Sequence, residues 1–419
     1  MSLLPPGAVR PDYEGYCLSN VPSTVQSLFG LDPGRPRLPK DALGDVETSG
    51  IDNVILMLCD GLGYNEWRRT PGTGFFGAFN TKGSVRPITS IFPSTTAAAL
   101  TSVSTGLTPQ EHGLPEWFVY MQELGEIILT LPFSRPGERG RDTLKGRFPE
   151  RALFDGAPVF RRLKTEGIGC MTFTGGYLAN TVYSTLTRAG TGVTPYSSAS
   201  DLSVSLRRFV EKAKGKNFVY VYWSDVDHIE HAYGQGTDES LVETSLISHA
   251  MQEGFLDRVD REAAKRTLIL LTADHGQLTV EPEKTVYVNR FTKLTRNLQK
   301  NPHGDMIPPW GNLRDTFYLV DESRLEETER YMQEKLDGVA TVMKTADGIK
   351  EGLFGINRPS GRFLRRVGNL MVLPHGNRTV FYRYKKGAIP DLKGQHGGLS
   401  KEEMTIPLAA ARLSDLQGH

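Results

Sequence analysis

Cysteine and long apolar segments are scarce in this chain of 419 residues, and each absence excludes a class of protein. The three cysteines, Cys17, Cys59 and Cys170, are far apart and odd in number, so neither a disulfide framework nor a cysteine zinc site is indicated. No stretch approaches the length of a membrane span, and residues 1–15 lack the basic and apolar regions of a signal peptide. These absences predict a cytoplasmic protein that does not span a membrane.

The chain also carries almost no net charge, because 49 lysine and arginine residues balance 48 aspartate and glutamate residues. This balance argues against general binding of polyanions, and we expect no stable complex with nucleic acid. Hydrophobic residues (38%) and charged residues (23%) occur in proportions typical of a folded core. The length suits one large α/β domain with an insertion, or two or three domains.

Short apolar runs predict the buried strands of the main domain. They do not alternate between apolar and polar residues, which is typical of strands covered on both faces in a parallel sheet. The runs are residues 53–60, 167–174, 217–225 and 267–274.

Helical patterns lie between these runs, at 201–215 and 239–266. In the second segment Val242 and Leu246 are four residues apart, as are Phe255 and Val259, which predicts one apolar helix face. Strands that alternate with helices predict a doubly wound α/β fold with a mostly parallel sheet.

Residues 281–390 have a different pattern, which predicts a small α+β cap inserted into the main domain. The catalytic domain would then comprise residues 1–280 and 391–419. Within the cap we expect strands at 315–320, 369–374 and 379–384, and a helix at 323–336. Ser323 and Glu326 have the spacing of a capping box at the start of that helix.

A bare dinucleotide-binding spacing, GTGFFG, occurs at residues 72–77. Its context is wrong, because NEWRRTP precedes it instead of a strand and the following AFNTKGS is a poor start for a helix. We interpret it as a chance match in a connector and assign it no phosphate.

Acids and histidines follow the predicted strands. Ligands of open α/β sheets bind beyond the carboxyl ends of the strands, so these side chains are expected to converge there. A lone aspartate is usually a helix cap and a lone histidine usually structural, as we expect for His112, His249, His303, His375 and His419. Three acids and three histidines together suit two divalent cations of the zinc type. They are Asp60, Asp227, His231, Asp274, His275 and His396.

The segment FPSTT, residues 92–96, precedes a helical pattern of small residues. A hydroxyl at a helix start lies near free backbone N–H groups, which favour phosphate, although Ser94 or Thr95 could simply be a cap. A hydroxyl beside a two-metal cluster would instead be activated as a nucleophile.

These motifs together resemble the alkaline phosphatase superfamily, and within it the compact bacterial form of the type I phosphodiesterase/nucleotide pyrophosphatase family. The resemblance runs from about residue 50 to about residue 410 in motif order, which is far more specific than any single motif. The motifs are CDG (59–61), FPSTT (92–96), TGLTPQEHG (105–113), DVDHIEH (225–231), ADHG (273–276) and GQHGG (394–398).

The resemblance implies an alkaline-phosphatase-like fold and two bound ions, zinc or alternatively manganese. Asp60, Asp274 and His275 would hold one ion together with the nucleophile. Asp227, His231 and His396 would hold the other. Thr96 matches the nucleophile, with Thr95 as the neighbouring alternative, and His112 would be structural.

The family often has an asparagine amide near the nucleophile that holds a phosphate oxygen, and the matching residue here is Ala99. The segment STTAAALTS (94–102) contains no cation, which favours phosphodiesters or nucleotides over monoesters as small-molecule substrates. Arg314, Trp117 and Phe118 are candidate substrate contacts, whereas Tyr222 and Trp223 lie in a predicted strand and are expected in the core.

Other interpretations stay open at this point. A phosphomonoesterase, phosphomutase or phosphonate hydrolase of the same superfamily would use similar ligands. A metal-binding protein without turnover would not need the hydroxyl, and an α/β domain whose acids are only helix caps would bind no metal.

Overall fold

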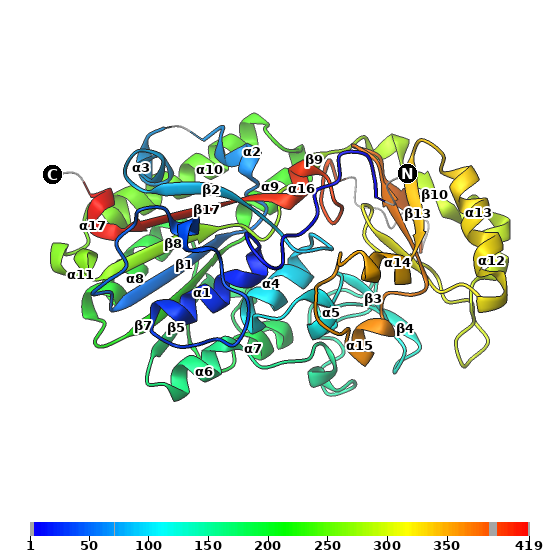
Figure 1. Cartoon of the computed structure of the whole chain (residues 1–419), viewed down its shortest axis with the longest axis horizontal. Helices are drawn as coiled ribbons and strands as arrows, with labels where there is room; N and C mark the ends of the chain where they lie inside the picture. The colour runs from blue at the N-terminus through cyan, green and yellow to red at the C-terminus, as the bar shows by residue number, and fades with distance from the viewer. Residues whose placement is uncertain (1–3, 71, 385–391, 418–419) are drawn as a thin grey trace.

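The computed structural model describes residues 4–70, 72–384 and 392–417 (Figure 1). Its main sheet has seven strands in the order β2-β17-β8-β1-β7-β5-β6. β17 is antiparallel to both of its neighbours, and the remaining pairs are parallel. The strands are β1 (Asn53–Cys59), β2 (Ser84–Thr89), β5 (Gly169–Gly175), β6 (Gly192–Tyr196), β7 (Asn217–Trp223), β8 (Thr267–Thr272) and β17 (Thr405–Arg412). The predicted α/β class with a mostly parallel sheet is confirmed.

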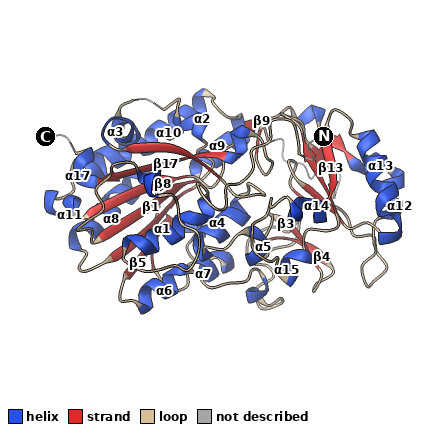
Figure 2. Cartoon of the chain, in the orientation of Figure 1, coloured by secondary structure: helices blue, strands red, loops and turns tan. Residues whose placement is uncertain are grey.

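Helices cover both faces of this sheet, as Figure 2 shows. Every residue of β1, β7 and β8 is therefore buried, which explains their unbroken apolar sequences. One helix layer comprises α1 (Val21–Leu28), α4 (Thr96–Thr105), α6 (Val159–Thr165) and α7 (Val182–Thr187). The other comprises α3 (Gly74–Lys82), α8 (Ala199–Lys212), α10 (Asp238–Met251), α11 (Arg261–Lys265) and α17 (Leu413–Leu416).

Two sequence predictions about these helices were wrong. The single helix at 239–266 is instead α10, a π-helical turn (Gln252–Leu256) and α11. Val242 and Leu246 are 64% and 50% exposed, because α10 packs through hydroxyl-bearing and apolar side chains on its opposite face. Residues 72–77 are also not a connector, because α3 begins at Gly74 within them. This helix packs in the core through three buried phenylalanines, Phe75, Phe76 and Phe79.

A second, smaller sheet lies at the other end of the molecule (Figure 1). It is antiparallel in the order β11-β12-β14-β13, and β10 pairs separately with β15. The strands are β10 (Val286–Tyr287), β11 (Trp310–Gly311), β12 (Thr316–Tyr318), β13 (Ala340–Lys344), β14 (Leu370–Pro374) and β15 (Val380–Phe381). The helices are α12 (Thr292–Asn297), α13 (Leu325–Lys335), α14 (Thr345–Lys350) and α15 (Gly361–Leu364).

The cap core reaches beyond the predicted insertion. Tyr120 and Ile127, from the hairpin β3 (Phe118–Met121) and β4 (Glu126–Leu129), pack with Trp310 and Phe317 in one apolar cluster. The boundaries 1–280, 281–390 and 391–419 stay a prediction, and the hairpin is an additional part of this packing unit.

The predicted capping box at Ser323 and Glu326 was wrong. Asp321 precedes a 3-10 turn (Glu322–Arg324), and its carboxylate accepts the Ser323 backbone N–H at 2.9 Å. The α-helix α13 begins only after that turn, so Ser323 is not at its N-cap.

Short elements complete the described structure. None of its helices has the length and apolar character that a membrane crossing needs. The short α-helices and strands are α2 (Tyr64–Trp67), α5 (Pro109–His112), α9 (Asp225–Tyr233), α16 (Lys401–Met404), β9 (Leu278–Thr279) and β16 (Gly394–Gln395). Further 3-10 turns are Leu18–Asn20, Lys40–Leu43, Glu150–Ala152, Gly176–Leu178, Pro282–Lys284 and Val288–Arg290.

Candidate active site

Three adjacent strands of the main sheet bring the predicted acids together. β8, β1 and β7 are neighbours and parallel, so their carboxyl ends lie at one edge. Asp60 follows β1, Asp274 follows β8, and Asp227 lies in α9 directly after β7. Gly61 permits this approach, because it has a φ of 76° and a Cβ atom there would lie 2.8 Å from the Asp227 Cα.

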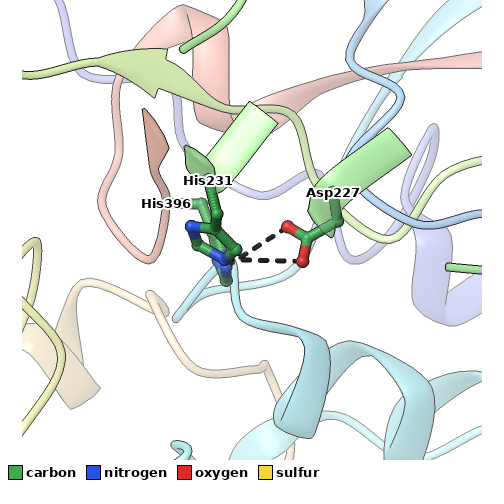
Figure 3. Close-up of side chains that lie close together, drawn as sticks. All are labelled: Asp227, His231 and His396. Atoms are coloured by element: carbon green, nitrogen blue, oxygen red, sulfur yellow. Dashed lines mark ion pairs between the residues drawn. The ribbon is translucent and has the colours of Figure 1, made fainter. Parts of the chain in front are cut away.

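Asp227, His231 and His396 form the first group (Figure 3). Asp227 and His231 are one turn apart in α9 and share a face, whereas His396 comes from the loop after β16. The Asp227 carboxylate points toward both imidazoles, with Oδ2 3.4 Å from His231 Nε2 and Oδ1 3.7 Å from His396 Nε2. This grouping is the one that the resemblance implied.

His275 is the centre of the second group. Its Nε2 lies 3.5 Å from Asp60 Oδ1, 3.4 Å from Asp274 Oδ2 and 3.1 Å from Thr96 Oγ1. Asp227 is also close enough to form a metal-ligand group with Asp60 and His275. The two groups therefore adjoin through Asp227.

All three histidines turn the same nitrogen toward this cluster. Each Nδ1 lies beside a backbone carbonyl to which it can donate its proton. The lone pair is then on Nε2, the nitrogen that faces the carboxylates. The Nδ1–O distances are 2.8 Å for His231 and Gly394, 3.0 Å for His396 and Ser94, and 3.2 Å for His275 and Gly276.

Two of the acids in the cluster have a buried carboxylate oxygen that no protein group satisfies among the described residues. Asp60 Oδ1 and Asp274 Oδ2 are buried and have no hydrogen-bond partner among the described residues. Burial, with the neighbouring carboxylates, raises the pKa of Asp60 well above its usual range, and burial raises the pKa of Asp274 to about 6. Burial lowers the pKa of His275 to about 4 and that of His396 to about 3, which keeps both imidazoles neutral. Oxygen and nitrogen donors of this kind fit divalent cations of the zinc type.

Neighbouring groups orient the candidate ligands. The Tyr222 hydroxyl donates to Asp60 Oδ2, and the Gln277 amide donates to Asp227 Oδ1. The backbone N–H groups of Gly61 and His275 donate to Asp274 Oδ1 at 3.1 and 3.0 Å. Tyr222 is in the core, as predicted, but its role as a partner of Asp60 was missed. No pattern singled out Gln277, although its position directly after DHG was a usable signal.

Only one hydroxyl of the FPSTT segment faces the cluster. Thr95 is the N-cap of α4, and its side chain accepts the Ala98 N–H at 3.5 Å. Ser94 Oγ donates to the Gly398 carbonyl at 2.8 Å. Thr96, the first residue of α4, points its hydroxyl at His275 Nε2. Ala99 is fully buried in the same helix.

The other described histidines lie outside the cluster. His112 is buried, with Nε2 3.1 Å from Ser102 Oγ and Nδ1 accepting the Leu114 N–H at 3.1 Å. His249 and His303 are exposed, and His375 contacts Thr341 Oγ1 at 2.8 Å. His419 lies outside the described residues.

Arg314, named from the sequence as a candidate substrate contact, is buried in an ion pair. It is 1% exposed, and its Nε and Nη2 donate to the two Glu403 oxygens at 2.9 Å each. Burial alone would raise the pKa of Glu403, but Arg314 and the hydrogen bonds to the carboxylate lower it. Glu403 also accepts the Gly398 N–H at 2.9 Å, so the pair supports the loop that carries His396. The Arg314 guanidinium therefore already binds protein groups, which does not support its prediction as a substrate contact.

A cavity of about 460 Å³ opens beside Thr96. The cluster residues Asp227, His231 and His396 line one end. Trp117 and Phe118, the predicted substrate contacts, line it as well, whereas Trp223 is buried in β7.

A buried carboxyl pair lies behind the nucleophile segment. Glu116 and Asp315 are both 0% exposed, and Thr95 is a neighbour of Glu116. Burial raises the pKa of Glu116 to about 8. Burial and the adjacent Glu116 carboxylate raise the pKa of Asp315 well above its usual range. At neutral pH the pair therefore retains protons, which limits the charge buried at the junction with the cap.

The model of the type I phosphodiesterase/nucleotide pyrophosphatase family matches residues 54–399. No curated protein sequence matches the chain.

Solved structures share the fold at low identity. Murine ectonucleotide pyrophosphatase/phosphodiesterase 5 is 17% identical, covering 85% of this chain and 87% of its own, with a TM-score of 0.60. An inactive variant of the murine protein was solved in complex with AMP. Phosphonoacetate hydrolase from Sinorhizobium meliloti 1021, in complex with phosphonoformate, is 15% identical, covering 86% of this chain and 93% of its own, with a TM-score of 0.61.

Proposed function

Because the chain belongs to the type I phosphodiesterase/nucleotide pyrophosphatase family, we propose that it hydrolyses phosphodiester or phosphoanhydride bonds through a covalent phosphothreonine at Thr96. Family membership supports phosphoester hydrolysis as the reaction class. The observation that carries the finer proposal is the position of the Thr96 hydroxyl, 3.1 Å from His275 Nε2, while Thr95 caps the helix.

The candidate ligands would hold two divalent ions, zinc or alternatively manganese. Asp60, Asp274 and His275 would hold one beside Thr96, and the group of Asp227, His231 and His396 would hold the other. When bound, such a pair lowers the pKa of a hydroxyl and neutralises charge on the attacking and leaving oxygens. The unpartnered oxygens of Asp60 and Asp274 support this assignment.

The residues of the chain then have separate roles in two displacements. The Thr96 hydroxyl releases its proton to solvent as Oγ attacks phosphorus in line with the leaving oxygen, and the new O–P bond forms as the bond to the leaving group breaks. The leaving oxygen takes up a proton from solvent. Water then attacks the phosphothreonine from the opposite side, which restores the Thr96 hydroxyl and releases the phosphate product.

Three observations favour diesters over the monoesters and phosphonates that related enzymes would take. The first turn of α4 contains no lysine or arginine, and Arg314 is paired with Glu403. The described residues that line the cavity also include no cationic lysine or arginine side chain. Among the described lining residues, a more highly charged phosphoryl group would therefore find no lysine or arginine beside it.

The proposal is tested by rapid acid quench during turnover of bis(p-nitrophenyl) phosphate, followed by peptide mapping. We expect phosphate on Thr96, and faster turnover of this diester than of p-nitrophenyl phosphate. Phosphate on Thr95 or Ser94 would move the nucleophile, and a clear preference for the monoester would favour a phosphomonoesterase. Absence of turnover in protein that retains about two metal ions would favour the metal-binding alternative.

A further inference from the structure

The cavity beside Thr96 has a reactive end and an apolar end. Thr96, Asp227, His231 and His396 line the reactive end, so a phosphoryl group at the cluster would place one substituent in the remaining space. The volume of about 460 Å³ is within the range of pockets that bury most of a small organic molecule.

Aromatic rings form a continuous wall at the apolar end. Phe118 stacks on Tyr384 with centroids 5.8 Å apart and an interplanar angle of 26°, and Phe381 meets the edge of Tyr384 at 5.8 Å. The Tyr384 hydroxyl donates to the Pro309 carbonyl at 2.8 Å. Its polar atom is therefore already bonded, and the ring contributes apolar surface.

Polar lining side chains away from the cluster are also engaged by the protein. Asn312 donates from Nδ2 to the His396 carbonyl at 3.3 Å and accepts the Leu313 N–H at 2.8 Å. Thr95 caps α4 through its own hydroxyl. The described lining residues leave two neutral polar side chains there, the Trp117 indole and the Gln395 amide, whose Nε2 is buried without a hydrogen-bond partner among the described residues.

The charges of the lining discriminate between substrate classes. Asp227 is the one carboxylate among the described lining residues, and none of them is lysine or arginine. A second phosphate in this space would lose water without gaining a cation from the described lining residues, which is unfavourable in an apolar environment. A neutral apolar group would instead gain from burial against the aromatic wall.

We infer that the cavity binds a large neutral apolar substituent of the phosphodiester, an alkyl, acyl or aryl group, in preference to a nucleoside polyphosphate. This inference rests on the proposed function, because it takes the cluster as the phosphate site. It narrows the substrate class to apolar phosphodiesters.

A series of phosphate monoesters tests the inference whichever side of phosphorus the substituent occupies. Methyl, butyl and octyl phosphate, and ADP, are assayed as inhibitors of bis(p-nitrophenyl) phosphate turnover, and their Kd values are measured by calorimetry on the metal-loaded protein. We expect affinity to rise by up to about fourfold per methylene group that becomes buried, and octyl phosphate to bind more tightly than ADP. Equal affinities along the series, or tighter binding of ADP, would overturn the inference.

A cation introduced into the wall gives an independent test. Leu129 lines the cavity and is half-buried, so Leu129→Lys should be tolerated. It should reduce the preference for octyl over methyl phosphate by at least tenfold, about the value of two methylene groups. Leu364→Lys is the matched control, since Leu364 is 51% exposed and lies outside the lining. Phe118→Ala should lower the same preference without adding charge. An unchanged preference in both cavity variants would contradict the inference. Loss of diester turnover in the wild type, with the calorimetric trend intact, would instead overturn the proposed function alone.

Discussion

The two ends of the cavity are assembled in different ways. At the cluster end, the acids Asp60, Asp274 and Asp227 follow three adjacent strands, and each accepts at least one hydrogen bond from a neighbouring group. At the apolar end, Phe118 and Tyr384 come from segments more than 260 residues apart and meet only through the packing of the cap. We therefore propose that the main sheet holds the reactive groups while the cap selects the substituent. The variants below test that division.

The largest effect is expected from Thr96→Ala. This change removes the proposed nucleophile but none of the acids or imidazoles, so diester turnover should fall by about 10⁴-fold or more while metal content remains. Thr95→Ala is the control, because loss of a cap should cost roughly 1 kcal/mol of stability and leave the chemistry in place. A fully active Thr96→Ala enzyme would mean that water attacks phosphorus directly, without a covalent intermediate.

Arg314→Ala should cause the next largest effect, on stability. It leaves Glu403 buried without its cation, for which a loss of about 3–5 kcal/mol in the free energy of unfolding is expected. Arg266→Ala is a matched control, since its pair with Asp52 at 2.8 Å is exposed and should contribute at most about 1 kcal/mol. Urea unfolding measures both variants.

If Arg314 instead contacts substrate, the variant would retain its stability and lose substrate affinity. That outcome would place Arg314 among the residues that select the substrate, and would contradict its role in supporting the loop of His396.

His396→Ala tests whether His396 is a metal ligand. This residue lies in the loop that Arg314 and Glu403 support. Removing a direct ligand should lower the affinity of the second metal by more than about 100-fold, beyond the effect usually seen for residues that only orient ligands. Metal content by mass spectrometry should fall from about two ions per chain toward about one. His249→Ala, at an exposed position, should retain both ions. Equal metal content in the two variants would remove His396 from the ligand set.

The smallest effect concerns the buried pair at the junction with the cap. Glu116 has a folded pKa of about 8 against an ordinary value of 4.5, so the folded protein keeps a proton that the unfolded chain releases. Its contribution therefore makes the protein less stable as pH rises from about 4.5 to about 8. Glu116→Gln should remove this dependence and gain about 1 kcal/mol or more over wild type across that interval.

Thermal or urea unfolding between pH 5 and pH 8 measures the change, and the exposed Glu239→Gln serves as the control. A parallel shift of both variants at every pH would show that Glu116 is ionised in the folded protein.

Local sequence patterns were sufficient for β1, β5, β7 and β8 of the main sheet, whereas β2, β6 and β17 were not predicted. The unbroken apolar runs that became β1, β7 and β8 predicted burial on both faces, because only a sheet covered by helices accommodates them. Asp60 directly follows β1 and Asp274 lies two residues after β8, so the common edge could be predicted from the sequence. Local pattern failed where packing decides, as for Val242 and Leu246, which have helical spacing yet face solvent.

The sequence by itself determined which chemical groups are present and on which elements they lie: the acids at the strand ends, the histidine four residues after Asp227, and the hydroxyls at the start of α4. The tertiary structure alone decided which of those hydroxyls faces the cluster, that Asp227 adjoins both groups, and that Arg314 pairs with Glu403. It also decided the aromatic wall of the cavity. The physical reason is that side-chain periodicity and residue hydrophobicity are local properties of a chain. The pairing of buried charges and the packing of rings instead depend on segments that only folding brings together.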